Sequence, residues 1–136
     1  MQSHESPISR MIMIRVDPGE DLLDALQRAV AEHDVRNGVF VSGAGSIRRY
    51  HFHVVSSTEL PPDNAFVKGD GAFDIVAITG AVLGGRVHAH ITFTDDATTL
   101  GGHLEPGCEV LTFAMVALAE TPARDLSGWD HVPGRS

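Results

Sequence analysis

Hydrophobic and polar residues alternate along much of this chain, and the pattern predicts a β-rich domain with one helix. Apolar side chains recur at every second position in most of the apolar runs, as they do in strands that are buried on one face. One segment differs, because its apolar residues follow helical spacing. Short turn signals separate the runs, so most strands are expected to pair as hairpins. We therefore predict an α+β fold with a mainly antiparallel sheet of about six or seven strands and one main helix. The clearest strand segments are residues 11–16, 39–41, 47–56, 73–83, 85–93 and 108–119.

The helix is predicted to begin at Asp17 and to end near Asn37-Gly38. Asp17 can cap it, Pro18 suits the first helical position, and Glu20 stands where a capping box needs an acidic residue. A glycine after an asparagine can supply a left-handed C-terminal cap.

Glycine-rich and polar segments predict the turns. Gly84-Gly85 is expected to form a tight hairpin turn, and residues 95–99 and 69–71 are also expected to be turns. Residues 59–64 contain two prolines and are expected to form a loop. The run Ser42-Gly43-Ala44-Gly45-Ser46 lacks the third glycine and the lysine of nucleotide-binding loops, so it is interpreted as a bend that permits close backbone packing.

Composition limits the protein class. A chain of 136 residues suits one domain, and its single cysteine excludes an internal disulfide. The apolar run 11–16 is too short for a signal peptide or a membrane span, so a cytoplasmic protein is expected. The net charge is −8 and Arg48-Arg49 is the only basic pair, which argues against nucleic-acid binding by this chain alone.

Three histidines are the strongest chemical signal. His88 and His90 share one face of a predicted strand, with their Cβ atoms roughly 6–7 Å apart. A turn at 95–99 brings the chain back, and Gly101-Gly102 could direct His103 to the same point. Three imidazoles with a fourth position left to water form the open site of a catalytic or ligand-exchanging metal, and neutral imidazole favours Zn²⁺. The alternative is that these are ordinary half-buried histidines.

Neighbouring residues leave further alternatives open. His51 and His53 form a second H-x-H pair that could join the site or lie on a half-exposed strand face. Glu105 is the candidate catalytic base, or else a turn carboxylate beside Pro106. Arg86 could hold an anionic substrate or be solvated. Cys108 has no second thiol with which to complete a closed structural site.

The order of these motifs resembles the plants-and-prokaryotes-conserved (PPC) domain, which includes the body of plant AT-hook proteins and many free-standing bacterial proteins. The resemblance rests on G-A-F-D-I-V at 71–76, G-R-V-H-A-H at 85–90, G-G-H-L-E-P-G at 101–107 and V-L-T-F at 110–113. It implies a homotrimer, and a metal site where the three histidines are present, here His88, His90 and His103. Bacterial members are often called DNA-binding, but the R-G-R-P core of an AT-hook does not occur in this sequence.

These observations predict a flexible N-terminus at 1–10, a PPC-like domain at 11–120 and a C-terminal extension at 121–136. The favoured function is divalent-metal binding through three histidines, with a small molecule bound or transformed at the metal; whether the protein is an enzyme is left open. The alternatives are a DNA-associated regulator and a trimeric interaction module without chemistry.

Overall fold

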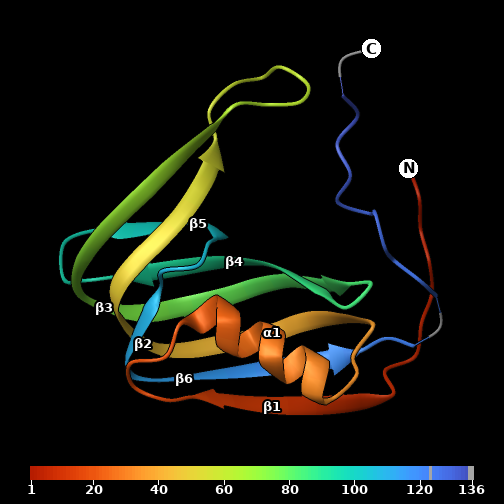
Figure 1. Ribbon diagram of the computed structural model, residues 1–136, viewed down its shortest axis with the longest axis horizontal. Coiled ribbons are helices and arrows are strands. Elements are labelled where there is room, and N and C mark those ends of the chain that lie inside the picture. Colours follow the sequence, from red (N-terminus) through yellow and green to blue (C-terminus); the bar gives the residue numbers. More distant parts are fainter. Residues whose placement is uncertain (123, 135–136) are drawn as a thin grey trace.

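The computed structural model describes residues 1–122 and 124–134, and its central feature is one antiparallel sheet with one helix (Figure 1). The six strands pair in the order β1-β6-β2-β3-β4-β5, and every pairing is antiparallel. The expected α+β class is therefore confirmed. No helix in the described residues has the length and apolar character needed to cross a bilayer. The elements are β1 (Arg10–Val16), α1 (Leu22–Glu32), β2 (Asn37–Val55), β3 (Asn64–Leu83), β4 (Arg86–Thr94), β5 (Thr99–Leu104) and β6 (Glu109–Glu120).

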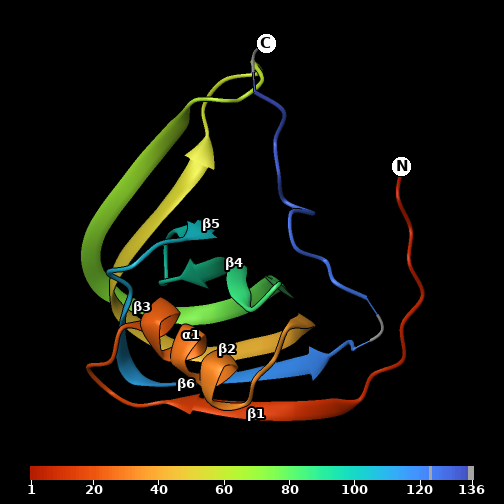
Figure 2. The same ribbon diagram turned by 45° about the vertical axis from the view of Figure 1, so that its right-hand side comes forward.

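The sheet is curled so strongly that its last strand, β5, pairs with β2 as well as with β4. Phe52 and His53 of β2 pair with Leu104 and His103 of β5, in addition to the pairing of β5 with β4. Helix α1 packs across β1, β6 and β4 on the inner face of this sheet (Figure 2). The core lies between the helix and the sheet, because the inner-facing residues of the strands are buried there. Beyond Arg49, where its pairing with β6 ends, β2 continues with β3 as a two-stranded arm formed by residues 50–55 and 64–69 (Figure 1).

Both predicted ends of the helix are wrong. The N-cap is Asp21, whose side chain accepts the backbone N–H of Asp24, and not Asp17. Residues 17–20 form a separate turn in which Glu20 accepts the N–H of Asp17, and Gly19 has a φ of 85° that a helix cannot use. The last turn ends at His33 because the next residue, Asp34, has a φ of 51°.

Two glycine-containing segments lie inside strands. Residues 42–46 belong to β2, so the predicted separate bend is wrong. A Cβ added to Gly45 would collide with the carbonyl oxygen of Phe113, so the close backbone packing expected there is confirmed. The predicted turn at 69–71 is wrong, because Gly69 and Asp70 pair with β2 within the long strand β3. A Cβ at Gly69 would collide with the ring of Tyr50, so this glycine makes room for an aromatic side chain.

The inner face of β6 is buried in the core, whereas its outer face is covered within one chain only near Ala117 and Ala119. Val110 and Val116 are buried, whereas Met115 on the outer face is 49% exposed. The register places Met13 of β1 on the same outer face, and Met13 is 71% exposed. The outer face of the β1-β6 region is therefore apolar and open to solvent in the single chain.

Candidate metal centre

The alternation expected for β4 positions the first two candidate ligands. Val87, Ala89 and Ile91 are buried in the core, so the intervening side chains of His88 and His90 face away from it. The two imidazole rings lie nearly parallel, with centroids 5.7 Å apart. The Gly84-Gly85 turn that precedes β4 is present as predicted, with positive φ at both glycines.

His103 reaches the same place through strand register. It is the pairing partner of His90 across β4 and β5, so both side chains emerge on one face. Gly101 permits the close approach of β5 to β4, since a Cβ there would collide with the carbonyl oxygen of Ile91. Gly102 permits the approach of β5 to β2, since a Cβ there would lie 2.6 Å from the carbonyl oxygen of His53. The expectation that the glycine pair directs His103 toward the other histidines thus has a steric basis.

The three imidazoles form a donor set that fits a divalent cation. One ring nitrogen from each of His88, His90 and His103 lies within 4.8 Å of the others. Burial lowers the pKa of His103 to about 4, with help from the neighbouring His53 and His88, and burial also lowers the pKa of His90. Both rings are therefore neutral at pH 7, the form in which imidazole binds a metal.

A second pair, His53 and Glu105, lies against this set. The His53 ring stacks on His103 with centroids 4.3 Å apart, and His53 Nδ1 lies 2.5 Å from a carboxylate oxygen of Glu105. Because a carboxylate accepts hydrogen bonds, His53 Nδ1 is the donor. His53, His103 and Glu105 also bring donor atoms within 4.8 Å of one another. The side chain of Glu105 thus reaches the histidine cluster.

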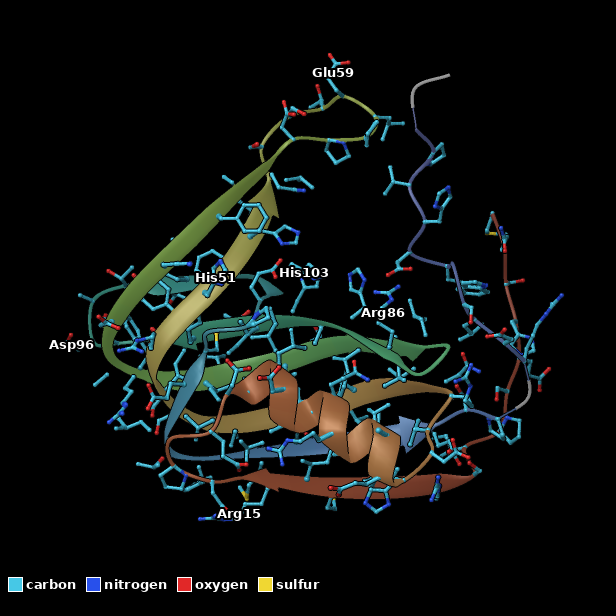
Figure 3. All side chains as sticks on the ribbon, in the orientation of Figure 1. Arg15, His51, Glu59, Arg86, Asp96 and His103 are labelled. Carbon is cyan, nitrogen blue, oxygen red and sulfur yellow. The ribbon has the colours of Figure 1, made fainter. Side chains whose placement is uncertain are left out.

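His51 does not join the cluster. Its Nδ1 lies 2.6 Å from the carbonyl oxygen of Pro106, and its ring lines a different cavity with Arg49 and Lys68. Figure 3 shows His51 on the arm to the left of His103, with Arg86 to the right. The two members of the second H-x-H pair therefore have different surroundings.

Sequence reasoning missed one residue at the site, Asp130 of the C-terminal extension. Its Oδ2 accepts hydrogen bonds from His88 Nδ1 at 2.8 Å and from Arg86 at 2.5 Å. Arg86 is thereby engaged with a protein carboxylate, which leaves less of its charge for an anionic substrate. No local motif marks Asp130, because its position depends on the path of a segment without regular secondary structure.

A cavity of about 490 Å³ opens beside the histidines, between the arm and the C-terminal segment. Its histidine wall contains His88, His90 and His103 together with His53. The remaining lining is mostly apolar and consists of Val54, Val55, Pro61, Pro62, Asn64, Gly102 and Val132.

Cys108 takes no part in this cluster. It is fully buried, and burial raises the pKa of its thiol to about 11. Its Sγ accepts the backbone N–H of His51 and donates to the carbonyl of the same residue. The thiol is a core residue that stays protonated at neutral pH.

Residues 3–122 match the family model of the Plants and Prokaryotes Conserved (PCC) domain, which is the PPC domain of the sequence comparison above. The chain belongs to this family. The match covers every strand and the helix, so the resemblance found in the sequence motifs is confirmed. It stops before the C-terminal segment that carries Asp130.

Solved structures share the PPC fold at low identity. A PPC protein from Pyrococcus horikoshii is 21% identical with a TM-score of 0.79, over 92% of this chain and 87% of that one. A metal-containing protein from Archaeoglobus fulgidus is 18% identical with a TM-score of 0.78, and the match covers 100% of this chain and 91% of that one. A Bacteroides thetaiotaomicron protein described as a candidate DNA-binding protein is 18% identical with a TM-score of 0.70, and the match covers 88% of this chain and 83% of that one.

Among curated proteins, the chain is similar to the bifunctional protein GlmU of a Synechococcus strain. The identity is 31% over 110 residues, which is 80% of this chain. The matched region is only 16% of the length of that relative. The similarity therefore concerns one part of a much longer protein.

Proposed function

We propose that this PPC domain binds a divalent cation, most readily Zn²⁺, through His88, His90 and His103. The observation that carries the proposal is the convergence of the three ring nitrogens within 4.8 Å of one another. Three nitrogen ligands leave a coordination position for water or another small ligand. Such an ion would act as a Lewis acid toward a bound oxygen or nitrogen donor.

The ligand of this centre is proposed to be a small molecule with an apolar body and one metal-binding group. The cavity of about 490 Å³ is within the range of small-molecule pockets, and it combines an imidazole wall with apolar surfaces. Val54, Val55 and Val132 would contact the body of such a molecule. Its oxygen or nitrogen donor would then face the three histidines.

Glu105 is proposed as the base of the site, acting with His53. Because His53 Nδ1 donates to Glu105, the other ring nitrogen of His53 is left as an acceptor. The carboxylate also has a second oxygen with which to accept a proton from a bound ligand or water. The donor atoms of both residues lie within reach of His103, so the pair stands beside the proposed ligand position.

The metal proposal is tested by elemental analysis of protein purified without a histidine tag. The wild type is expected to hold one divalent ion per chain after incubation with Zn²⁺ and desalting. His90→Ala should lose most of the metal, whereas the matched variant His51→Ala should keep it, because His51 bonds to Pro106 outside the cluster. Wild-type metal content in His90→Ala, or equal losses in both variants, would contradict the assignment.

The charge distribution favours this function over DNA binding. Arg48 pairs with Glu109, and Arg49 pairs with Asp70 at 2.9 Å and lies 3.7 Å from Glu109. The only basic pair of the sequence is thus compensated by carboxylates of the same chain. With a net charge of −8, the chain has little free positive charge to offer a phosphate backbone.

Homotrimerisation is proposed to occur through the outer face of the β1-β6 region. Met11, Met13 and Met115 are each about half or more exposed there, and Val39 of β2 adjoins them because it pairs with Ala119, the partner of Met11. Exposed apolar surface of this kind commonly marks a protein–protein interface. The number of copies, three, comes from the family resemblance.

A further inference from the structure

The C-terminal segment 126–132 is tied to the body of the domain at the start of its path. The backbone N–H of Leu126 donates to the side-chain oxygen of Asn37 at 2.9 Å, and Asn37 is 6% exposed. The next residue, Ser127, packs against Gly84, and a Cβ added to Gly84 would collide with the Ser127 hydroxyl. Two backbone turns follow, from Trp129 to Leu126 and from His131 to Gly128. The segment thus follows a defined path beside the β3-β4 hairpin turn.

This path brings the carboxylate of Asp130 against the Nδ1 atom of His88. Asp130 Oδ2 receives the Nδ1–H of His88 at 2.8 Å and a guanidinium N–H of Arg86 at 2.5 Å. The Asp130 side chain is only 18% exposed, and that of His88 is 29% exposed. Two residues later, Val132 lines the cavity beside the histidines. Figure 3 shows Arg86 pointing toward the C-terminal segment, on the side of His103 away from the arm.

A neutral imidazole carries its proton on either Nδ1 or Nε2, and only the unprotonated nitrogen can bind a metal. A carboxylate that faces Nδ1 accepts a hydrogen bond from the Nδ1–H group and so favours the tautomer that is protonated on Nδ1. Arg86 donates a hydrogen bond to the same oxygen of Asp130, which holds the carboxylate facing His88. His88 is consequently held with Nδ1 protonated and Nε2 available.

We propose that Asp130 is a positioning residue of the metal centre, which fixes the tautomer and the ring orientation of His88, while Arg86 holds Asp130 in place. This inference rests on the proposed metal function. Hydrogen bonds from metal-binding histidines to carboxylates typically change metal affinity by about 10- to 100-fold. The C-terminal segment lies outside residues 3–122, which match the family model.

The competing explanation is that Asp130 only anchors the segment through its ion pair with Arg86. The Arg86 side chain is 56% exposed, and exposed ion pairs contribute little to stability. The two explanations predict different results when the Asp130 carboxylate is removed and the fold is kept. If Asp130 positions His88, the tautomer preference of His88 is lost; if Asp130 only anchors the segment, that preference is unchanged.

The experiment compares Asp130→Ala with Asp125→Ala, which removes the same charge from the residue immediately before this segment. Asp125 bonds to Ser127 and does not contact His88. The tautomer of His88 is read from long-range ¹H–¹⁵N spectra of metal-free, ¹⁵N-histidine-labelled protein. Zn²⁺ affinity is measured by competition with a chromophoric chelator, and thermal unfolding confirms that each variant folds.

The wild type and Asp125→Ala are expected to show His88 protonated on Nδ1. Asp130→Ala should lose this preference and bind Zn²⁺ about 10- to 100-fold more weakly. Conservative replacement by Glu should restore part of the affinity. Unchanged His88 spectra in Asp130→Ala, or equal Zn²⁺ affinity in the two alanine variants, would overturn the proposal. If the wild type binds no metal, the proposed function fails, and the tautomer measurement alone decides whether Asp130 positions His88.

Discussion

His103 of β5 is the register partner of two histidines at once, His90 on β4 and His53 on β2. This double pairing is possible because the curled sheet brings β5 between the other two strands. The result is a row of imidazoles in which the middle ring, His103, belongs to both groups of potential donors. The position of His103 therefore controls the geometry of the entire cluster.

The first prediction concerns pH. The pKa of His103 is lowered to about 4, mainly by burial and further by His53, His88 and His90, against a smaller opposing effect of Glu105. The unfolded chain, with an ordinary histidine pKa near 6.5, binds this proton more readily than the folded chain, so stability falls as pH decreases from about 6.5 to about 4. Urea unfolding of metal-free protein at a series of pH values should show this decrease. It should be smaller in His103→Gln, and an equal slope in both proteins would contradict the assignment.

The second prediction concerns Gly102. An added Cβ would lie 2.6 Å from the carbonyl oxygen of His53 and 2.8 Å from the Phe52 ring, so Gly102→Ala must push β5 away from β2. We expect destabilisation of about 1–3 kcal/mol, together with weaker Zn²⁺ binding because His103 moves with its strand. Chemical denaturation and chelator competition measure the two effects. The control is Gly134→Ala, since nothing lies within 4 Å of the Cβ position there.

The third prediction concerns Asn37, which joins the hairpin turn to the C-terminal segment. Its side-chain oxygen accepts the backbone N–H groups of Gly84 at 3.2 Å and Leu126 at 2.9 Å. Asn37→Ala leaves both donors without this partner and should cost about 1–3 kcal/mol. Released from its anchor, the segment should be cut faster by trypsin after Arg124. The exposed Asn64→Ala variant should retain the wild-type cleavage rate, and an unchanged rate in Asn37→Ala would show that the anchor is unimportant.

The fourth prediction tests assembly. Met13 is 71% exposed on the outer face, so Met13→Glu should place a charge in the proposed interface and shift the protein from trimer to monomer. Light scattering coupled to size-exclusion chromatography measures the mass. Ile8→Glu introduces the same charge at an exposed apolar residue before β1, and it should leave the trimer intact. A monomeric wild type would refute the interface.

The fifth prediction concerns nucleic acid. Because Arg48 and Arg49 are paired with carboxylates, the isolated chain should show no binding to a fluorescent DNA duplex at micromolar protein and low salt. Fluorescence anisotropy is the measurement. Saturable binding that weakens in Arg49→Ala would favour the DNA-associated alternative instead.

Local pattern was sufficient for much of β4 but insufficient for the ends of α1. The alternation of Val87, His88, Ala89 and His90 predicts which side chains face the core, because neighbouring residues of a strand always point to opposite faces. The N-cap predicted for α1, Asp17, is wrong because Asp17 and Asp21 are both acceptable N-cap residues. The choice depends on distant contacts, such as the hydrogen bond from the Gly19 N–H to the carbonyl of Val110.

The sequence by itself determined the fold class, the family and the three histidines, since alternation, turn glycines and motif order are properties of neighbouring residues. Only the tertiary structure decided that His53 and Glu105 lie against His103 while His51 does not, and that Asp130 reaches His88 from 42 residues away. These contacts depend on how a curled sheet closes and on the path of a segment without regular structure. Neither is encoded in the spacing of residues along the chain.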